Sequence, residues 1–209
     1  KKISLEGRKL MVAIPAYDGK VCIETAYMLP QLAMAAMQYR FQLTLAHISG
    51  SSILTKARNI LVKQFLDTDF TDLLFVDADI TFTVHDVIRM MAVSTEKDVV
   101  SGACPRRDGQ RLFYFESEKE LEFDNQGLLK VEKAGTGFML IRRHVIEKLV
   151  EAHPEWKYWD DIQKQDFYSI FDFLSGPDGY MGEDYLFCKR VHEAGMTVYL
   201  DPETNLGHY

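Results

Sequence analysis

The sequence has few cysteines, no long apolar run and no excess of positive charge. Its three cysteines are far apart and form no Cys-x-x-Cys pair, so we expect reduced thiols rather than a disulfide framework or a zinc site. No apolar run reaches the roughly 18 residues that a membrane-spanning helix needs. The net charge of −7 argues against broad nucleic-acid binding, which requires a positively charged surface.

The sequence also opens without the basic and apolar segments of a secretory signal peptide. Together with the sparse cysteines, this favours a cytoplasmic protein. The 209 residues are 47% hydrophobic, which is typical of a globular protein with a sizeable core. We therefore expect one domain over residues 1–209.

Apolar strands and helices alternate along the first half of the chain. Strands are predicted at Leu10–Ile14, Phe41–Ile48, Leu73–Val76 and Asp98–Gly102, and helices at Cys22–Tyr39, Ile53–Leu66 and Thr83–Val93. This alternation predicts an α/β fold whose first half is a parallel sheet flanked by helices. Pro30 lies inside the first helix and predicts a kink or a break there.

The second half is mixed. It contains predicted strands at Phe138–Ile141 and Val198–Leu200 and helices at His144–Glu151 and Tyr185–Glu193. Leu112–Phe115 and Leu128–Val131 are expected to pair as a small β annex, whereas Pro154–Gly179 is aromatic-rich and irregular. Three arginines are expected in an exposed surface loop: Arg106, Arg107 and Arg111.

The clearest functional signal is a carboxylate pair that follows a buried strand. Leu73–Val76 is a continuous apolar run, typical of a strand buried on both faces. Asp77 and Asp79 come directly after it, at the strand end where open α/β sheets bind ligands. Two close carboxylates repel each other, and a hard divalent cation such as Mg²⁺ or Mn²⁺ relieves that repulsion. A solvated acidic turn is the alternative for an isolated Asp-x-Asp.

Further segments around this pair resemble the nucleotide-sugar-dependent glycosyltransferases of the GT-A fold, especially family 2. The matching segments are VAIPAYD, FVDAD, GTGFMLIRR and GEDYLFCKRVHEAG, in the order that the family shows. The resemblance covers nearly the whole chain and implies a Rossmann-like mixed sheet. It also implies a nucleotide-binding half at residues 1–102 and an acceptor-side half at residues 103–209. A long aromatic insertion before Glu183 departs from the family pattern and leaves the acceptor open.

The resemblance implies a donor site and a metal site. Mn²⁺ or Mg²⁺ would be bound by Asp77, Asp79 and His208. The donor would be a nucleoside-diphosphate sugar, with a UDP-sugar expected, and would contact Pro15, Ala16, Tyr17, Asp18, Arg58, Asp77, Ala78 and Gly137. A guanidinium suits phosphate oxygens. For Lys56, Arg58 and Asn59 a solvated helix face is the alternative, and for Tyr17 it is plain packing.

The same resemblance assigns catalysis to the segment that begins the last helix. Asp184 would act as the base that deprotonates an acceptor hydroxyl, and Glu183 would share that role or orient the acceptor. The alternative for Asp184 is a helix N-cap, because Asp satisfies free amides at a helix start. An acceptor platform or the core of the annex would be formed by Trp156, Tyr158, Trp159, Tyr168 and Phe171.

We therefore expect a metal-dependent, inverting glycosyltransferase acting on a glycan or another hydroxyl acceptor, with no nucleic acid bound and no transmembrane segment. A nucleotidyltransferase of the sugar-nucleotide pyrophosphorylase type is disfavoured, because residues 15–20 lack the Gly-rich basic loop usual there. A non-catalytic module that binds nucleotide-sugars or glycans remains open.

Overall fold

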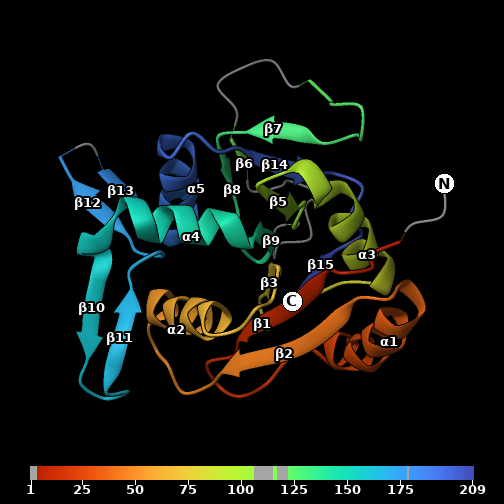
Figure 1. Ribbon diagram of the computed structural model, residues 1–209, viewed down its shortest axis with the longest axis horizontal. Coiled ribbons are helices and arrows are strands. Elements are labelled where there is room, and N and C mark those ends of the chain that lie inside the picture. Colours follow the sequence, from red (N-terminus) through yellow and green to blue (C-terminus); the bar gives the residue numbers. More distant parts are fainter. Residues whose placement is uncertain (1–3, 106–114, 117–121, 178) are drawn as a thin grey trace.

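The computed structural model describes residues 4–105, 115–116, 122–177 and 179–209, and its centre is a seven-stranded mixed sheet (Figure 1). The strand order is β2-β1-β3-β9-β5-β14-β7. The strands are β1 (Lys9–Pro15), β2 (Gln42–Ile48), β3 (Asp72–Val76), β5 (Val99–Gly102), β7 (Leu129–Val131), β9 (Phe138–Arg142) and β14 (Val198–Asp201).

The first three strands of this order are parallel, as predicted. β2 and β3 each pair with β1 in parallel register. β9 then lies antiparallel between β3 and β5, and β14 continues parallel to β5. β7 closes the far edge, antiparallel to β14. The sheet is therefore mixed, and the predicted α/β class with a GT-A-like, Rossmann-like sheet is confirmed.

Helices cover both faces of the sheet because side chains alternate sides along each strand. In β3, Leu73 and Phe75 belong to one core cluster, and Leu74 and Val76 belong to the other. The first cluster includes buried residues of α2 (Leu54–Leu66), α4 (Arg143–Ala152) and α5 (Glu183–Glu193). The second includes buried residues of α1 (Ile23–Tyr39) and α3 (Val84–Val93).

Smaller elements complete the described part of the chain. Four two-stranded pairs are formed by β4 (Ile80–Thr81) with β15 (Gly207–His208), β6 (Phe115–Glu116) with β8 (Lys133–Ala134), β10 (Lys157–Asp160) with β11 (Gln165–Tyr168), and β12 (Leu174–Gly176) with β13 (Gly179–Met181). Short 3₁₀ turns lie at η1 (Ser94–Glu96) and η2 (Pro154–Trp156).

Three local predictions differ from the structure. α1 continues through Pro30 without a break, because Pro30 is exposed while Leu32 and Ala36 anchor the following turns in the core. The segment expected to be irregular before residue 179 contains the β10–β11 hairpin and β12. Asp160 builds the turn of the first hairpin, since its carboxylate accepts from the backbone N–H groups of two following residues.

The predicted annex pairing is also wrong in its described part. Leu129–Val131 joins the central sheet beside β14, and Phe115 pairs with Ala134 instead. Alternation of apolar residues indicates a strand but does not identify its partner. Residues 112–114 of the predicted annex, and the loop arginines Arg106, Arg107 and Arg111, lie outside the described residues.

Cys22, Cys104 and Cys188 are free thiols. No helix within the described ranges is long and apolar enough to cross a membrane.

Candidate active site

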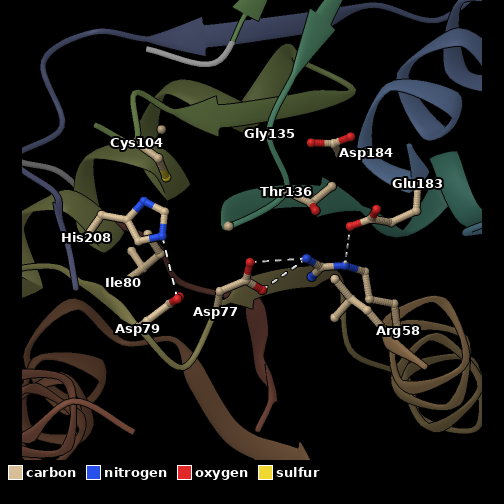
Figure 2. A pocket seen from close by; sticks show the side chains of 13 residues that line it. Arg58, Asp77, Asp79, Ile80, Cys104, Gly135, Thr136, Glu183, Asp184 and His208 are labelled. Atoms are coloured by element: carbon tan, nitrogen blue, oxygen red, sulfur yellow. Dashed lines mark hydrogen bonds and ion pairs between the residues drawn. The ribbon is translucent and has the colours of Figure 1, made fainter. Parts of the chain in front are cut away.

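A cavity of about 400 Å³ lies beyond the end of β3 (Figure 2). Segments far apart in the sequence line it, because the central strands bring their neighbouring loops to one edge of the sheet. Its polar and small lining residues include Arg58, Asp77, Asp79, Gly102, Cys104, Gly135, Thr136, Gly137, Glu183, Asp184 and His208. The Asp pair, the Gly-rich segment, the Glu-Asp pair and the terminal histidine thus meet in one place.

Arg58 extends from α2 into the centre of this cavity and is only 1% exposed. Its Nη2 donates to both carboxylate oxygens of Asp77, at 3.0 and 3.2 Å. Its Nε lies 3.7 Å from Oε1 of Glu183. The guanidinium also lies 5.2 Å from the ring centre of Phe75 and 5.9 Å from that of Phe171. Two carboxylates and two rings therefore hold this one cation.

Two nitrogens of Arg58 remain without hydrogen bonds. Within the described part of the chain, neither Nε nor Nη1 has a hydrogen-bond partner. A buried donor left in this state costs roughly 1–3 kcal/mol, and buried polar groups in native proteins are nearly always satisfied. Arg58 therefore offers two donor nitrogens that an oxygen-rich ligand can satisfy.

The alternative of a solvated helix face fails for this part of α2. Asn59 is buried and exchanges hydrogen bonds with the backbone of Phe171, at 2.9 and 2.8 Å. Lys56 lies 2.6 Å from the carboxylate of Asp160. These contacts hold the face of α2 that carries Arg58 against residues 160–171, which contain the turn and second strand of the β10–β11 hairpin.

His208 reaches the cavity because β15 pairs with β4 immediately after the Asp pair. His208 lies opposite Ile80 in that ladder, and the N–H of Tyr209 donates to the carbonyl of Asp79 at 3.0 Å. The imidazole Nε2 then lies 3.6 Å from Oδ2 of Asp79. Its Nδ1 lies 2.9 Å from the carbonyl oxygen of Pro105. A carbonyl only accepts, so Nδ1 carries the hydrogen, and in the neutral ring Nε2 presents a lone pair.

The side chains of Asp79 and His208 suit a divalent metal. Their oxygen and imidazole donors match Mn²⁺ chemistry, and a histidine whose second nitrogen donates to a backbone carbonyl is the usual arrangement in metal sites. Two donors each about 2.1 Å from one ion lie at most about 4.2 Å apart, so the 3.6 Å separation of Asp79 and His208 permits a shared ion. No three His, Cys, Asp or Glu side chains in the described ranges form a complete set by themselves. The residues therefore fit an ion that takes its other ligands from phosphate oxygens and water, as Mg²⁺ commonly does.

Glu183 and Asp184 occupy the first turn of α5, on the other side of the cavity from His208 (Figure 2). The N-cap position belongs to Gly182, so the alternative of Asp184 as the N-cap is wrong. Oδ1 of Asp184 accepts from the N–H of Tyr185 at 2.8 Å. Burial, and secondarily the negative charge of Glu183, raise the pKa of Asp184. Such a carboxylate holds a proton more readily than an exposed one, as a general base must.

The Gly-rich segment before β9 allows the Asp pair to pack closely. The carbonyl of Gly137 accepts from the N–H of Asp77 at 2.8 Å. A Cβ at position 137 would lie 3.4 Å from Oδ2 of Asp77 and 3.4 Å from Cγ1 of Ile80, at the lower limit of ordinary van der Waals contact. The absence of a side chain at Gly137 therefore lets Asp77 and Ile80 pack close to this backbone.

Several buried lining residues were not predicted, among them Thr136 and Cys104. Thr136 is enclosed within the Gly-rich segment. Burial, followed by the charges of Asp77 and Asp79, raises the pKa of the Cys104 thiol. Cys104 follows β5 at the same edge of the sheet as the Asp pair. Its position directly after a predicted strand could therefore have identified it as a lining residue.

The predicted first loop lies at a second cavity, of about 310 Å³, between the ends of β1 and β2 and the start of α1. Ala16 lines it, whereas Tyr17 and Asp18 are exposed and line neither cavity. A hydrogen bond from Lys20 lowers the pKa of Asp18. Pro15 ends β1. The carbonyl of Ala78 accepts from the N–H of Cys22 at 2.9 Å, which ties the Asp pair to the start of α1.

The predicted aromatic platform is partly core. Phe171 is fully buried against Phe75 and Phe187. Trp156 stacks on His153, with ring centres 3.8 Å apart, and lies under Arg190. Tyr158 and Tyr168 are half-buried, and Trp159 alone is exposed. Another exposed pair, Phe173 and Tyr180, stacks with ring centres 6.0 Å apart. Phe173 directly precedes β12, and Tyr180 lies in β13, the strand before Glu183.

Comparisons with known proteins agree on the fold. No family model matches the sequence, and no curated protein matches it. Several solved structures resemble the chain. A197 from STIV has a TM-score of 0.60 at 19% identity, over 97% of this chain and 85% of that one. GalNAc-T7 with UDP, GalNAc and Mn²⁺ has a TM-score of 0.57 at 12% identity, over 96% of this chain and 43% of that one.

A third is S. aureus TarS 1-349 in complex with UDP-GlcNAc, with a TM-score of 0.55 at 15% identity, over 95% of this chain and 58% of that one. The chain thus spans less than two thirds of the GalNAc-T7 and TarS chains that it matches. At these identities the likeness concerns the arrangement of the backbone. The chain has a GT-A-like fold, with its candidate site at the carboxyl edge of the central sheet.

Proposed function

We propose that this protein transfers a sugar from a nucleoside-diphosphate sugar to an acceptor hydroxyl, with inversion at the anomeric carbon. One observation carries the proposal: the Asp79–His208 pair and the Glu183–Asp184 pair lie on opposite sides of one cavity, with Arg58 and Asp77 between them (Figure 2). Groups suited to a diphosphate therefore face a group suited to act as a base. An inverting transfer needs this separation, because the base acts opposite the leaving group.

The donor's diphosphate would lie at the Asp79–His208 end. Asp79 and His208 would hold Mn²⁺ or Mg²⁺, whose charge stabilises a departing diphosphate. Asp77 would contact the ribose or the metal. Nε and Nη1 of Arg58, which have no hydrogen-bond partner among the described residues, would donate to oxygens of the donor, where charge-assisted hydrogen bonds are strong.

The nucleoside would extend toward the second cavity, with the backbone of Ala78 and Gly137 on its path and Pro15, Ala16, Tyr17 and Asp18 at its end. A UDP-sugar is the donor that we propose. Two structures of similar fold contain such a ligand: GalNAc-T7 with UDP, and TarS with UDP-GlcNAc.

Asp184 would act on the acceptor. Its carboxylate takes the proton of the acceptor hydroxyl as the oxygen attacks the anomeric carbon of the donor sugar. The bond from that carbon to the phosphate oxygen breaks, and the nucleoside diphosphate leaves with the electron pair. Glu183, held by Arg58 at 3.7 Å, orients the acceptor and keeps negative charge beside Asp184.

The test is Asp184→Asn, measured with a panel of UDP-sugars, Mn²⁺ and a panel of hydroxyl acceptors. We expect the rate of UDP release to fall about 100-fold or more, the usual scale for loss of a general base. Binding of the UDP-sugar, measured by calorimetry, and the melting temperature should stay near those of the wild type. Asp67→Asn, at the exposed end of α2, is the matched control and should change none of the three quantities.

Two outcomes would contradict this assignment. An unchanged rate in Asp184→Asn would remove Asp184 from catalysis. Binding of a UDP-sugar by a wild-type protein that never releases UDP with any acceptor would favour the non-catalytic binding module. Release of pyrophosphate from a nucleoside triphosphate and a sugar phosphate would instead indicate a nucleotidyltransferase.

A further inference from the structure

Strand β2 is an unprotected edge of the central sheet. It stands at one end of the strand order and pairs only with β1 among the described strands. Its sequence, QLTLAHI, contains no proline and no Asp, Glu, Lys or Arg. Natural sheet edges are usually blunted by charges, proline or a covering segment, because an open row of backbone N–H and C=O groups recruits another strand. A seven-residue edge without such a device is suited to pairing.

Helix α1, which lies beside this edge, has an exposed surface that is almost uncharged. Glu24 is its sole charged residue between Ile23 and Tyr39. Four large apolar side chains are exposed, and the most exposed of them is Met37, at 83%. The four are Ile23, Tyr27, Met34 and Met37. Charge is depleted and Met and Tyr are enriched at the centres of protein interfaces.

The orientation of α1 brings part of this surface to the open edge of β2. On one flank of α1, Ala35 and Gln38 line a cavity shared with α3. Leu29 lines another cavity together with Leu45 of β2, so α1 lies over β2. At 100° per residue, Ala33 and Met37 lie on the flank opposite α3. That flank faces the side on which β2 has its open edge.

We propose that this surface, formed by β2 and the Ala33–Met37 flank of α1, is the interface of a homodimer. Two copies related by a two-fold axis would pair their β2 strands antiparallel, making one continuous sheet, with the two α1 flanks in contact across it. A two-fold interface uses the same patch on both copies, and a strand edge is complementary to a second copy of itself. Leu45, the midpoint of β2, is 50% exposed and would meet its counterpart at the axis.

Charge and area favour a second copy over other occupants. Each chain carries a net charge of −7, which opposes association through acidic surfaces, whereas β2 and residues 33–37 contain no Asp, Glu, Lys or Arg. Helices that lie on membranes usually carry Lys or Arg along their polar face, and α1 has neither. Met37 and Leu45 are 83% and 50% exposed, and together with the seven-residue edge of β2 they supply area that a second copy of the same patch can bury.

The test is the mass of the protein in solution, measured by analytical ultracentrifugation. We expect a dimer of twice the chain mass of 24.1 kDa. Leu45→Lys and Met37→Lys should each raise the dimer dissociation constant about 100-fold or more, because like charges would face each other across the axis. Ile162→Lys is the matched control: Ile162 is 80% exposed in the turn between β10 and β11, outside the patch, and this variant should remain dimeric.

A cross-linking variant tests whether the two β2 strands meet at Leu45 without adding a charge to the patch. In a Cys22→Ser background, which removes the one native thiol that is not buried, Leu45→Cys should form a disulfide-linked dimer on mild oxidation. Ile162→Cys in the same background should not. A monomeric wild type at 100 μM, or a dimer that survives both lysine substitutions and gives no cross-link, would overturn the proposal. Neither measurement depends on glycosyl transfer, so this proposal and the proposed function fail independently.

Discussion

Arg58 and Asp77 form an asymmetric ion pair, and removing either partner should therefore have opposite consequences for stability. Arg58 is nearly fully buried, and only Nη2 of its nitrogens makes hydrogen bonds within the described residues. Asp77, in contrast, lies at the rim of a cavity that water can enter. Taking a guanidinium out of water costs several kcal/mol, and a buried ion pair replaced by apolar groups is often no less stable.

The expected magnitudes follow from these contacts. Arg58→Met keeps the packing against Phe75 and Phe171 and removes the desolvated charge, so its melting temperature should stay within about 3 °C of the wild type or rise. Asp77→Ala leaves the cation buried, with Glu183 at 3.7 Å as its remaining ion-pair partner among the described residues. Loss of charge-assisted hydrogen bonds then costs about 2 kcal/mol. For a chain of this size, that lowers the melting temperature by about 4–8 °C.

Thermal and urea denaturation of the two variants and the double variant would measure this asymmetry. The double variant should resemble Arg58→Met, because the buried cation that makes Asp77→Ala unstable is then absent. Both single variants should lose UDP-sugar turnover. A larger loss of stability in Arg58→Met than in Asp77→Ala would refute the reasoning, because Arg58 would then be a net stabilising residue rather than one kept for its ligand.

Two further predictions concern pH and metal. Burial and Glu183 raise the pKa of Asp184 above its ordinary value of 3.8, so turnover should fall as pH drops through that raised pKa. The stability contributed by the protonated form should decline as pH rises through the same range. Glu183→Gln should shift the acid limb of the pH–rate profile to lower pH, and an unmoved limb would contradict the assignment. His208→Ala should weaken Mn²⁺ binding in the presence of UDP by about 10- to 100-fold, as measured by Mn²⁺ electron paramagnetic resonance, with His144→Ala as the exposed control; equal affinities would exclude His208 as a ligand.

Much of the fold follows from local patterns in the sequence. The five-residue run of β3, buried along its length, and the alternation of strands and helices before residue 102 predict a parallel half-sheet. The sequence did not predict which strands pair with each other in the second half of the chain. β9 lies between β3 and β5, and Leu129–Val131 pairs with β14. Both pairings depend on contacts between residues far apart in the chain.

Some residues of the candidate site could be predicted from motifs, and others could not. Asp77, Asp79, Glu183, Asp184 and His208 come from motifs whose order indicates one site, and the structure places them around one cavity. The contacts of Arg58 with both Asp77 and Glu183 were not predictable, because periodicity reports neither the depth of a side chain nor its direction. Cys104 belongs to no motif, and Thr136 lies within the GTGFMLIRR segment without a predicted role. Tyr17 and Asp18 matched a motif but lie outside both cavities.

The position of β9 has a consequence for synthesis of the chain. A ribosome produces β3 and β5 well before residues 138–142, yet β9 separates these two strands in the finished sheet. Until β9 emerges, the nascent chain presents one side of β3, an apolar strand, without its final neighbour. Such edges are prone to mispairing. We expect arrested nascent chains that end near residue 130 to bind chaperones and to be sensitive to protease over residues 72–76, and chains extended past residue 142 to lose both properties.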